Sequence, residues 1–421
     1  MRIWLGTIGE PWPTDSKNPR LLRTGVMALH YARGGDEVVW FNDTFDAPRK
    51  RHRFAIGTTL QAEPRLTLIG LHGSGYARNV SLARIRYHRQ LANEFTRLAE
   101  PMQPPDAIVA SMPPLELAEA MMRYGQAHNV PVVTDIRDLW PDIWVEVAPR
   151  PLWPFAKALL KPYYNSLARI VAGSSAISGV SELAVDWALS AGHRARNPFD
   201  GILPLAYEPP VLTPDEIARA SAFWSAQGIV ENGHDLVVCY FGALSRRYEF
   251  EPVFRALEMM SAQERSRVRI VICGAGEAEA GMRSRLDPEG RIQMPGWMDA
   301  AQIEVLKRRA HVGLLPYPSS QDYVQLLPNK VFDYLTGGLP ILTSLKGNVA
   351  NLVTGNGVGW LYENNDAADL KRHLVRLEED RAGVTKAAEK SVALAARYSA
   401  KNIYDDFRAR LVAIIESGRA P

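Results

Sequence analysis

The chain has 421 residues, of which 47% are hydrophobic and 23% charged, and its formal net charge is +3. This balance is typical of a globular enzyme and excludes a disordered or fibrous chain. The charge is too small to indicate nucleic-acid binding, and the sequence has no run of 18 apolar residues that would predict a membrane-spanning helix. A chain of this length is typical of two domains of about 200 residues each.

The cysteines and the amino terminus bear on the cellular compartment. Cys239 and Cys273 lie in apolar runs that predict buried strands, so we expect a reduced cytosolic chain with neither disulfide nor metal site. Residues 1–12 lack the basic and then apolar pattern of a signal peptide. These features predict a cytoplasmic protein or one peripheral to the inner face of the membrane.

The first half alternates short apolar runs with longer amphipathic segments. The pattern predicts strands over residues 1–6, 36–41, 66–71, 107–111, 131–135 and 170–172, and helices over residues 19–34, 82–99, 114–128 and 176–189. Strands that alternate with helices form a parallel sheet with helices on its faces. Residues 1–205 are therefore predicted to form a Rossmann-like domain.

A second series of the same kind follows a stretch rich in Pro, Gly and Asp at residues 197–213, which predicts the connection between domains. The pattern predicts strands over residues 236–241, 269–273, 312–315 and 340–343, and helices over residues 250–262, 300–309 and 330–335. Residues 206–395 are thus predicted to be a second doubly wound domain. Residues 367–416 have helical spacing with breaks near Gly383 and at 398–399, and the last helix, within residues 396–421, is expected to cross back to the first domain.

The densest chemical signal lies between two predicted strands, at residues 316–340. Pro328 suits the first turn of a helix, where the free amide groups of Asn329 and Lys330 and the charge of Lys330 would bind a phosphate. Asp333, one turn further, is placed to accept hydrogen bonds from two ribose hydroxyls. The alternative is that Lys330 and Asp333 form a solvated ion pair on an ordinary helix.

Residues 328–340 read Pro-Asn-Lys-Val-Phe-Asp-Tyr-Leu-Thr-Gly-Gly-Leu-Pro. This run resembles the Pro-Ser-Lys, Glu-Tyr and Gly-x-Pro pattern of the GT4 glycosyltransferases, and is similar to that of the amino-sugar (fucosaminyl) transferases of bacterial surface polysaccharide synthesis. The resemblance implies an α/β GT-B fold, with two Rossmann-like domains facing a cleft and the donor site in the second. The family's paired glutamates are Gln325 and Asp333 here; a shorter Asp333 can still hold ribose, whereas Gln325 lacks the charge that faces the donor sugar.

The resemblance also implies which residues bind the donor. Arg246 and Arg247 follow a predicted strand, and guanidinium groups bind phosphate oxygens in pairs and neutralise a leaving diphosphate without a metal; the alternative is that one of them faces water. Gly274 begins a Gly-x-Gly loop that lacks the third glycine of an NAD fingerprint. Trp297 either packs near the base or is an ordinary core or turn residue. The complete predicted donor set is Gly242, Arg246, Arg247, Gly274, Gly296, Gln325, Leu326, Leu327, Asn329, Lys330 and Asp333.

Acceptor-side residues are predicted in the first domain. Arg137-Asp138-Leu139-Trp140-Pro141 follows a predicted strand, where doubly wound folds place ligands, and a similar run occurs in the resembled branch. Asp138 is the candidate acid or base for the acceptor hydroxyl, the alternative being a helix cap. Glu10 and Arg20, in the first loop, and Arg137 are candidates for placing the acceptor or the loop.

Two segments mix basic and aromatic residues, at residues 82–97 and 153–169. Such helices suit an anionic membrane surface, and the alternative is a solvated helix face. Contact with lipid would make a lipid-linked glycan the natural acceptor.

These features predict a glycosyltransferase that moves a hexose or N-acetylhexosamine from a nucleoside-diphosphate sugar, UDP before GDP, to a hydroxyl of a surface glycan. The resemblance implies that the enzyme retains the anomeric configuration and needs no metal. Its partners would be the donor and a glycan or lipid-linked glycan, without a cofactor or nucleic acid. The alternatives are a GT-B isomerase such as a UDP-sugar 2-epimerase, or a sugar-nucleotide-binding subunit without catalysis. The missing third glycine argues against an NAD oxidoreductase.

Overall fold

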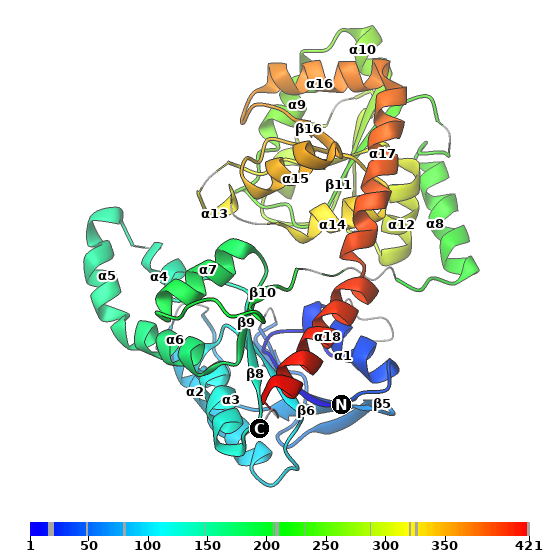
Figure 1. The fold of residues 1–421 in the computed structure, drawn as a ribbon. Coiled ribbons are helices and arrows are strands. Elements are labelled where there is room, and N and C mark those ends of the chain that lie inside the picture. Colours follow the sequence, from blue (N-terminus) through cyan, green and yellow to red (C-terminus); the bar gives the residue numbers. More distant parts are fainter. Residues whose placement is uncertain are drawn as a thin grey trace. The chain divides into compact units, whose positions relative to one another are not determined.

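The chain folds into two units in the computed structural model (Figure 1). The structure describes residues 1–15, 21–47, 49–78, 81–146, 148–204, 206, 210–231, 233–286, 288–319, 321–324 and 327–418. One unit consists of Met1–Ala206 and Ala400–Pro421, and the other of Tyr207–Ser399. The chain therefore leaves the first unit once and returns to it with its last helix.

The first unit is built on an eight-stranded sheet. Its order is β10-β9-β8-β7-β1-β2-β6-β5, and every pair is parallel except β5 with β6. The strands are β1 (Arg2–Gly6), β2 (Glu37–Asp43), β5 (Thr59–Glu63), β6 (Leu66–Leu71), β7 (Ala107–Met112), β8 (Val132–Ile136), β9 (Ala176–Gly179) and β10 (Gly201–Ile202), and β3 (Phe45–Asp46) pairs with β4 (Arg51–His52) apart from this sheet. The strand order reverses beside β1, which is where doubly wound sheets bind ligands.

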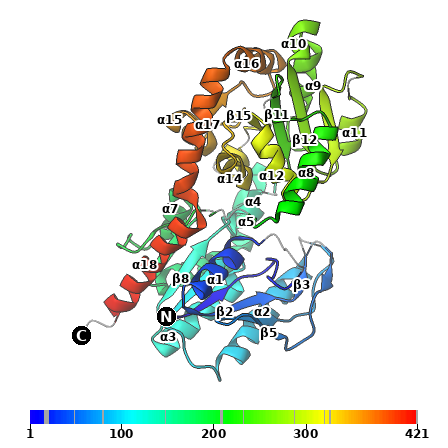
Figure 2. The ribbon, with the colours of Figure 1, turned by 90° about the vertical axis from the view of Figure 1, so that its right-hand side faces the viewer.

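Helices cover this sheet and include the end of the chain. They are α1 (Arg23–Arg33), α2 (Leu82–Ala99), α3 (Leu115–His128), α4 (Asp142–Glu146), η1 (Arg150–Leu152), α5 (Trp153–Leu159), α6 (Lys161–Gly173), α7 (Glu182–Ala191) and α18 (Ala400–Gly418). Helix α18 lies beside α1 in Figures 1 and 2, where Tyr404 donates a hydrogen bond to the Arg23 carbonyl (3.0 Å) and Arg408 pairs with Asp36 (2.6 Å). Buried side chains such as Phe407 join it to the core.

Two predictions in the first unit are wrong. Residues 170–172, predicted as a strand, end helix α6, and the strand is β9, where a helix was predicted to begin. Leu167, Ile170 and Val171 are buried at helical spacing, so this apolar run is one face of a helix. Helix α7 begins only after Ser181, whose side chain accepts a hydrogen bond from the Ala184 amide (3.3 Å) and caps the helix.

The second unit has a six-stranded parallel sheet in the order β13-β12-β11-β14-β15-β16. The strands are β11 (Leu236–Phe241), β12 (Val268–Cys273), β13 (Ile292–Gly296), β14 (Val312–Leu315), β15 (Ile341–Thr343) and β16 (Gly359–Leu361). The helices are α8 (Pro214–Ala226), α9 (Glu251–Glu258), α10 (Ala262–Ser266), α11 (Glu279–Arg283), α12 (Ala300–Arg309), α13 (Gln321–Val324), α14 (Asn329–Thr336), α15 (Asn348–Asn356), α16 (Ala367–Glu379), α17 (Arg381–Ala395) and η2 (Ala396–Tyr398). Helix α8 packs against α12, and α14 against α17 (Figure 2).

Caps decide two helix ends that differ from prediction in this unit. The helix predicted over residues 250–262 ends at Glu258, and Ser261 and Glu264 form a reciprocal capping box that starts the separate helix α10 at Ala262. The break expected near Gly383 lies at Asp380, whose carboxylate accepts a hydrogen bond from the Gly383 amide (2.9 Å) and starts α17. In both cases a short polar side chain satisfies amide groups that the helix leaves free.

Candidate active site

Three predicted donor-site glycines lie side by side at one edge of the second sheet. Gly242 and Gly274 directly follow β11 and β12, and Gly296 ends β13. Gly242 donates its amide hydrogen to the Cys273 carbonyl (2.9 Å), and Gly274 donates to that of Gly296 (2.7 Å). Their φ angles are +141°, +145° and +94°, a region that side chains disfavour. The neighbouring strand ends thus form a continuous row of hydrogen-bonded glycine backbone.

Backbone contact between two loops requires glycine at position 274. A Cβ added there would lie 1.8 Å from the Gly242 carbonyl oxygen, and one at Gly276 would lie 2.4 Å from that of Leu244. The Leu244 amide also donates to the Ala275 carbonyl (3.0 Å). The two glycines of the Gly-x-Gly sequence are therefore required because the loop after β12 packs closely against the loop after β11.

Gly274→Ala is expected to destabilise the second unit by about 1–3 kcal/mol, because the added methyl group overlaps backbone that cannot rotate away. The measurement is the denaturant midpoint of purified protein. Gly281→Ala is the matched control: Gly281 lies in α11, and its added Cβ meets no atom within 4 Å. The control is expected to be neutral or stabilising by up to about 1 kcal/mol. Equal midpoints for the two variants would contradict the close contact.

Lys330 brings a positive charge to the glycine row. Its Nζ donates a hydrogen bond to the Tyr317 hydroxyl (3.1 Å) and lies 5.1–5.8 Å from the ring centres of Tyr240, Tyr317 and Tyr248. A Cβ at Gly242 would come within 2.6 Å of this Nζ. Aromatic faces stabilise an ammonium group, so these rings hold the charge at the turn after β11.

Sequence reasoning missed these tyrosines, although Tyr317 lies within the motif at residues 316–340. The rings of Tyr248 and Tyr317 stack at 4.2 Å, and Tyr323 packs edge-on against Tyr317 at 5.4 Å. Burial raises the pKa of Tyr317, and hydrogen bonding with Tyr248 adds to the rise, so its hydroxyl stays protonated. The signal that could have found them is the density of tyrosine around the motif.

The rest of the motif lies on helix α14 and just before it. Pro328 is the N-cap of α14 rather than part of its first turn, and Asn329 is exposed at the first position. Asp333 is only 8% exposed, which argues against the alternative of a solvated surface pair. Leu327 is half-buried and packs against the core. The predicted residues Gln325 and Leu326 lie outside the described residues.

The two arginines after β11 are exposed and lie in different surroundings. The Arg246 amide donates to the Glu277 carboxylate (3.1 Å) and its Nε to the Glu277 carbonyl (3.4 Å). The Arg247 guanidinium lies 5.0 Å from the ring centre of Tyr323. Trp297 is 74% exposed, which excludes a core position and leaves a turn residue or a place near the base.

In the first unit, Glu10 and Arg137 hold the first loop in place. Glu10 is 3% exposed, and its carboxylate accepts hydrogen bonds from the amides of Thr24 (3.0 Å) and Gly25 (3.2 Å) at the start of α1. Arg137 binds Glu10, the Asp135 carboxylate (3.0 Å) and the Thr24 hydroxyl (2.7 Å). Burial alone would lower the pKa of Arg137, but the charges of Glu10 and Asp135 outweigh it and raise the pKa. The contacts of Glu10 and Arg137 thus hold the first loop against the start of α1 and the end of β8. The predicted residue Arg20 lies outside the described residues.

Asp138 lies beyond β8 and is exposed to solvent. Neighbouring atoms nevertheless desolvate part of its carboxyl group and raise its pKa above the ordinary 3.8, against the opposing positive charges of Arg137 and Arg84. Helix α4 begins four residues later, at Asp142, so Asp138 does not cap it. A reachable carboxylate with a raised pKa suits proton transfer.

These two Rossmann-like units, each with a mainly parallel sheet, define the GT-B fold. Residues 225–395 match the glycosyl transferases group 1 family model, so the second unit contains a glycosyl transferases group 1 domain. HepE from Anabaena, crystallised with UDP and glucose, aligns with a TM-score of 0.64 at 15% identity over 98% of this chain and 100% of that one. Sucrose-phosphate synthase from Thermosynechococcus elongatus aligns at 0.69 and 14% identity over 99% of both chains. The predicted fold is confirmed.

Curated sequence relatives match a smaller part of the chain. The amylovoran biosynthesis glycosyltransferase AmsK of Erwinia amylovora is 28% identical over 130 residues, which are 30% of this chain and 31% of that protein. The matches span between 28% and 32% of the length of the curated relatives found. Together with the family model, they confirm the predicted resemblance to glycosyltransferases of surface polysaccharide synthesis.

Proposed function

We propose that this chain is a retaining glycosyltransferase that moves a hexose or N-acetylhexosamine from a nucleoside-diphosphate sugar to a hydroxyl of a surface glycan. UDP is the favoured nucleotide, because the structurally similar HepE was crystallised with UDP and glucose. The chemistry needs no metal or cofactor, since fixed cationic side chains can neutralise the leaving diphosphate.

One observation carries the proposal: the Lys330 ammonium is held at the turn after β11, where three strand ends present glycine backbone. A diphosphate needs positive charge, which Lys330 supplies at this edge of the sheet, and helix α14, which carries Lys330, begins there with the positive end of its dipole. Arg246 and Arg247 follow the same turn and add exposed guanidinium groups. Asp333, one turn along α14 from Lys330, would accept the ribose hydroxyls.

In the proposed reaction, the bond between the anomeric carbon and the diphosphate oxygen breaks, and the diphosphate leaves with the bonding electron pair. The acceptor oxygen forms the new bond to the anomeric carbon and gives its proton to the Asp138 carboxylate. Lys330 and the two arginines stabilise the charge that develops on the leaving group.

The test of the donor site is a thermal-shift and calorimetric screen against UDP, GDP, ADP, NAD and their sugar conjugates. A ligand at 100 times its Kd stabilises the folded state by about 2.7 kcal/mol, so selective stabilisation by UDP or UDP-sugars is expected. Asp333→Ala should abolish it, whereas Gly281→Ala should keep it. Absence of stabilisation by every nucleoside diphosphate would refute the proposal. UDP release that depends on added glycan would separate transfer from isomerisation.

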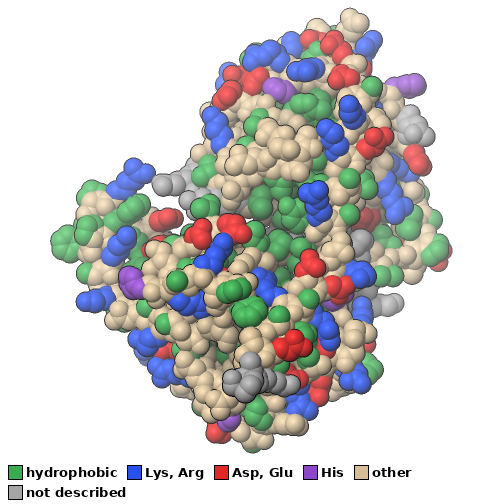
Figure 3. All heavy atoms as spheres, in the orientation of Figure 1, with side chains coloured by type: hydrophobic (Ala, Val, Ile, Leu, Met, Phe, Trp, Pro, Cys, Tyr) green, Lys and Arg blue, Asp and Glu red, His purple; other side chains and the backbone are tan. Residues whose placement is uncertain are grey.

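The acceptor is proposed to be lipid-linked, with the chain in the cytoplasm and in peripheral contact with the inner membrane. No helix in the described ranges is both long and apolar enough to cross a bilayer. Green and blue side chains gather over α5 at the left of Figure 3. The exposed apolar residues, here named the α5 patch, are Leu152, Phe155 and Leu159, at 50%, 74% and 81% exposure. The exposed basic residues beside them are Arg150, Lys157 and Lys161.

The α5 patch combines apolar side chains with positive charge, which suits an anionic bilayer surface. In the other basic segment, Arg86, Arg89 and Arg97 are exposed, whereas His88 on α2 is only 1% exposed and its Nδ1 lies 3.7 Å from the Glu116 carboxylate.

The double variant Phe155→Ser and Leu159→Ser is expected to weaken binding to phosphatidylglycerol vesicles by at least about tenfold, because two exposed apolar side chains no longer enter the interface. Flotation or co-sedimentation with the vesicles measures the fraction of protein bound. Ile56→Ser is the control, since Ile56 is 73% exposed in the same unit but outside the patch. Equal vesicle binding by both variants would exclude the patch as the membrane contact.

A further inference from the structure

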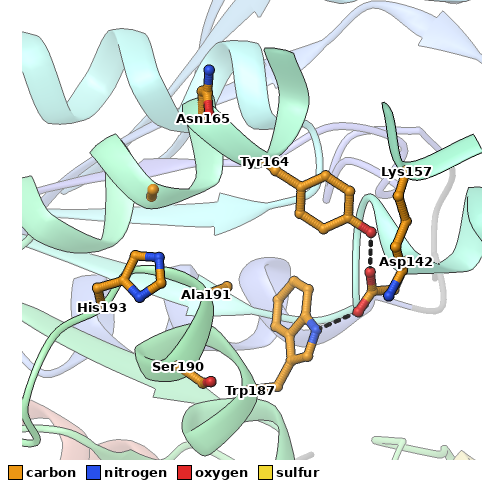
Figure 4. Close-up of a pocket in the computed structure, with 9 residues that line it drawn as sticks. Asp142, Lys157, Tyr164, Asn165, Trp187, Ser190, Ala191 and His193 are labelled. Atoms are coloured by element: carbon orange, nitrogen blue, oxygen red, sulfur yellow. Dashed lines mark hydrogen bonds between the residues drawn. The ribbon is translucent and has the colours of Figure 1, made fainter. Parts of the chain in front are cut away.

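A polar pocket of about 440 Å³ lies in the first unit, between α4, α5, α6 and α7 (Figure 4). Its volume is within the range of about 300–1,000 Å³ that is typical of small-molecule sites. The polar and aromatic lining residues are Asp142, Lys157, Tyr164, Asn165, Trp187, Ser190 and His193. None of them belongs to the predicted donor or acceptor residues, so the pocket is not explained by the site described above.

The Asp142 carboxylate fixes the two aromatic side chains that line the pocket. The Tyr164 hydroxyl donates to one oxygen of Asp142, and Trp187 Nε1 donates to the other at 2.7 Å. Figure 4 shows both bonds as dashed lines, with the two rings reaching Asp142 from α6 and α7. Because both rings are fixed before any ligand arrives, binding against them costs little conformational entropy.

The rim of the pocket offers hydrogen bonds of both kinds. Asn165, Ser190 and His193 are exposed and provide donors and acceptors. His193, the residue after the C-cap Gly192 of α7, adopts a φ of +48°, a left-handed conformation that is uncommon for a residue with a side chain. The rim is thus not an ordinary helix end, because a histidine stands where glycine is usual.

The chemistry of the lining narrows the ligand class. Asp142 and Lys157 place opposite charges in the pocket, so the lining has no net charge that would select a phosphate or another ion. An alkyl chain is also disfavoured, because it would displace water from the polar groups that line the pocket without replacing their hydrogen bonds. A neutral sugar ring suits both features, because its C–H face packs on an aromatic ring and its hydroxyls pair with amide, hydroxyl and imidazole groups.

The pocket is also close in the chain to the candidate base. Asp142 is four residues after Asp138, and four residues span about 14 Å at most. The geometry points to a saccharide subsite: this pocket binds a neutral sugar unit of the glycan acceptor, away from the hydroxyl that reacts. This inference rests on the proposed transfer to a glycan and adds the place where the acceptor is recognised.

The test is binding of a panel of neutral di- and trisaccharides of glucose, galactose and mannose, followed by saturation-transfer NMR and by tryptophan fluorescence on the full chain. At least one sugar is expected to bind, and Ser190→Trp is expected to weaken its Kd by about tenfold or more, because the indole fills the pocket. Ala127→Trp is the matched control, placed at an exposed position of α3 that does not line the pocket. Inorganic phosphate at equal ionic strength should not compete.

Three outcomes would overturn the inference: no sugar of the panel binds, Ser190→Trp binds as tightly as Ala127→Trp, or inorganic phosphate competes with the sugar. Competition by phosphate would assign the pocket to an anion instead. Thermal stabilisation by UDP, measured on the same preparations, distinguishes failure of the saccharide subsite from failure of the proposed transferase function. If UDP stabilises the chain and no sugar binds, only the subsite fails; if no nucleotide stabilises it, the transferase proposal fails whatever the sugars do.

Discussion

Lys330→Ala is expected to lower kcat by about 10²–10³-fold, the usual effect of removing a fixed group that stabilises charge in the transition state. The ammonium lies at the turn after β11, within hydrogen-bond distance of Tyr317 and over three tyrosine rings. No other side chain of the described motif brings a full positive charge to that turn. Steady-state kinetics with a UDP-sugar and a glycan acceptor measure the change.

Two further variants make the Lys330 result specific. Lys346→Ala removes an exposed lysine of the same unit, 3.5 Å from Glu363, and should leave kcat unchanged. Tyr317→Phe removes the hydroxyl that accepts from Lys330 but keeps the ring, so a loss smaller than that of Lys330→Ala is expected. Near-normal turnover in Lys330→Ala, with an unchanged thermal midpoint, would show that Lys330 does not serve the leaving group.

Asp138→Asn is expected to lower kcat by about 10²–10⁴-fold, the range by which a positioned acid or base accelerates proton transfer. Asparagine keeps the shape of the side chain and cannot take the proton of the acceptor hydroxyl. Donor affinity should be nearly unchanged, because the residues proposed to grip the nucleotide are in the other unit. Calorimetry with UDP and turnover on the same protein measure the two quantities separately.

The pH dependence distinguishes a base from a structural residue at this position. A raised pKa means that Asp138 is protonated at a pH where an ordinary aspartate is charged, so the acidic limb of kcat/KM should lie above pH 3.8. Arg84 lowers the pKa of Asp138, and Arg84→Ala should therefore move this limb to higher pH. An acidic limb that does not move in Arg84→Ala would contradict the assignment of Asp138 as the base.

Much of the second unit was predictable from the sequence because its strands are continuous apolar runs. Residues 236–241 and 312–315 are strands β11 and β14 with the predicted limits, and residues 300–309 are helix α12. Buried parallel strands need side chains that are apolar on both faces, and such runs stand out against the amphipathic helices around them. The strand predicted at residues 170–172 was wrong because this run is also short and apolar. A short apolar stretch has no period that distinguishes a strand from one face of a helix.

The sequence by itself determined the class of fold, the position of the motif at residues 316–340 and the residue types that point to a nucleotide sugar. These are local properties, because strand alternation, helix caps and short motifs depend on neighbours in the chain. The tertiary structure alone decided which groups meet. In the folded chain, Lys330 lies against Gly242 and near three tyrosine rings. The Glu10 carboxylate accepts hydrogen bonds from amides at the start of α1, and a pocket forms beside Asp142. Each of these contacts joins residues far apart in the chain, and only the packing of the helices on the sheets brings them together.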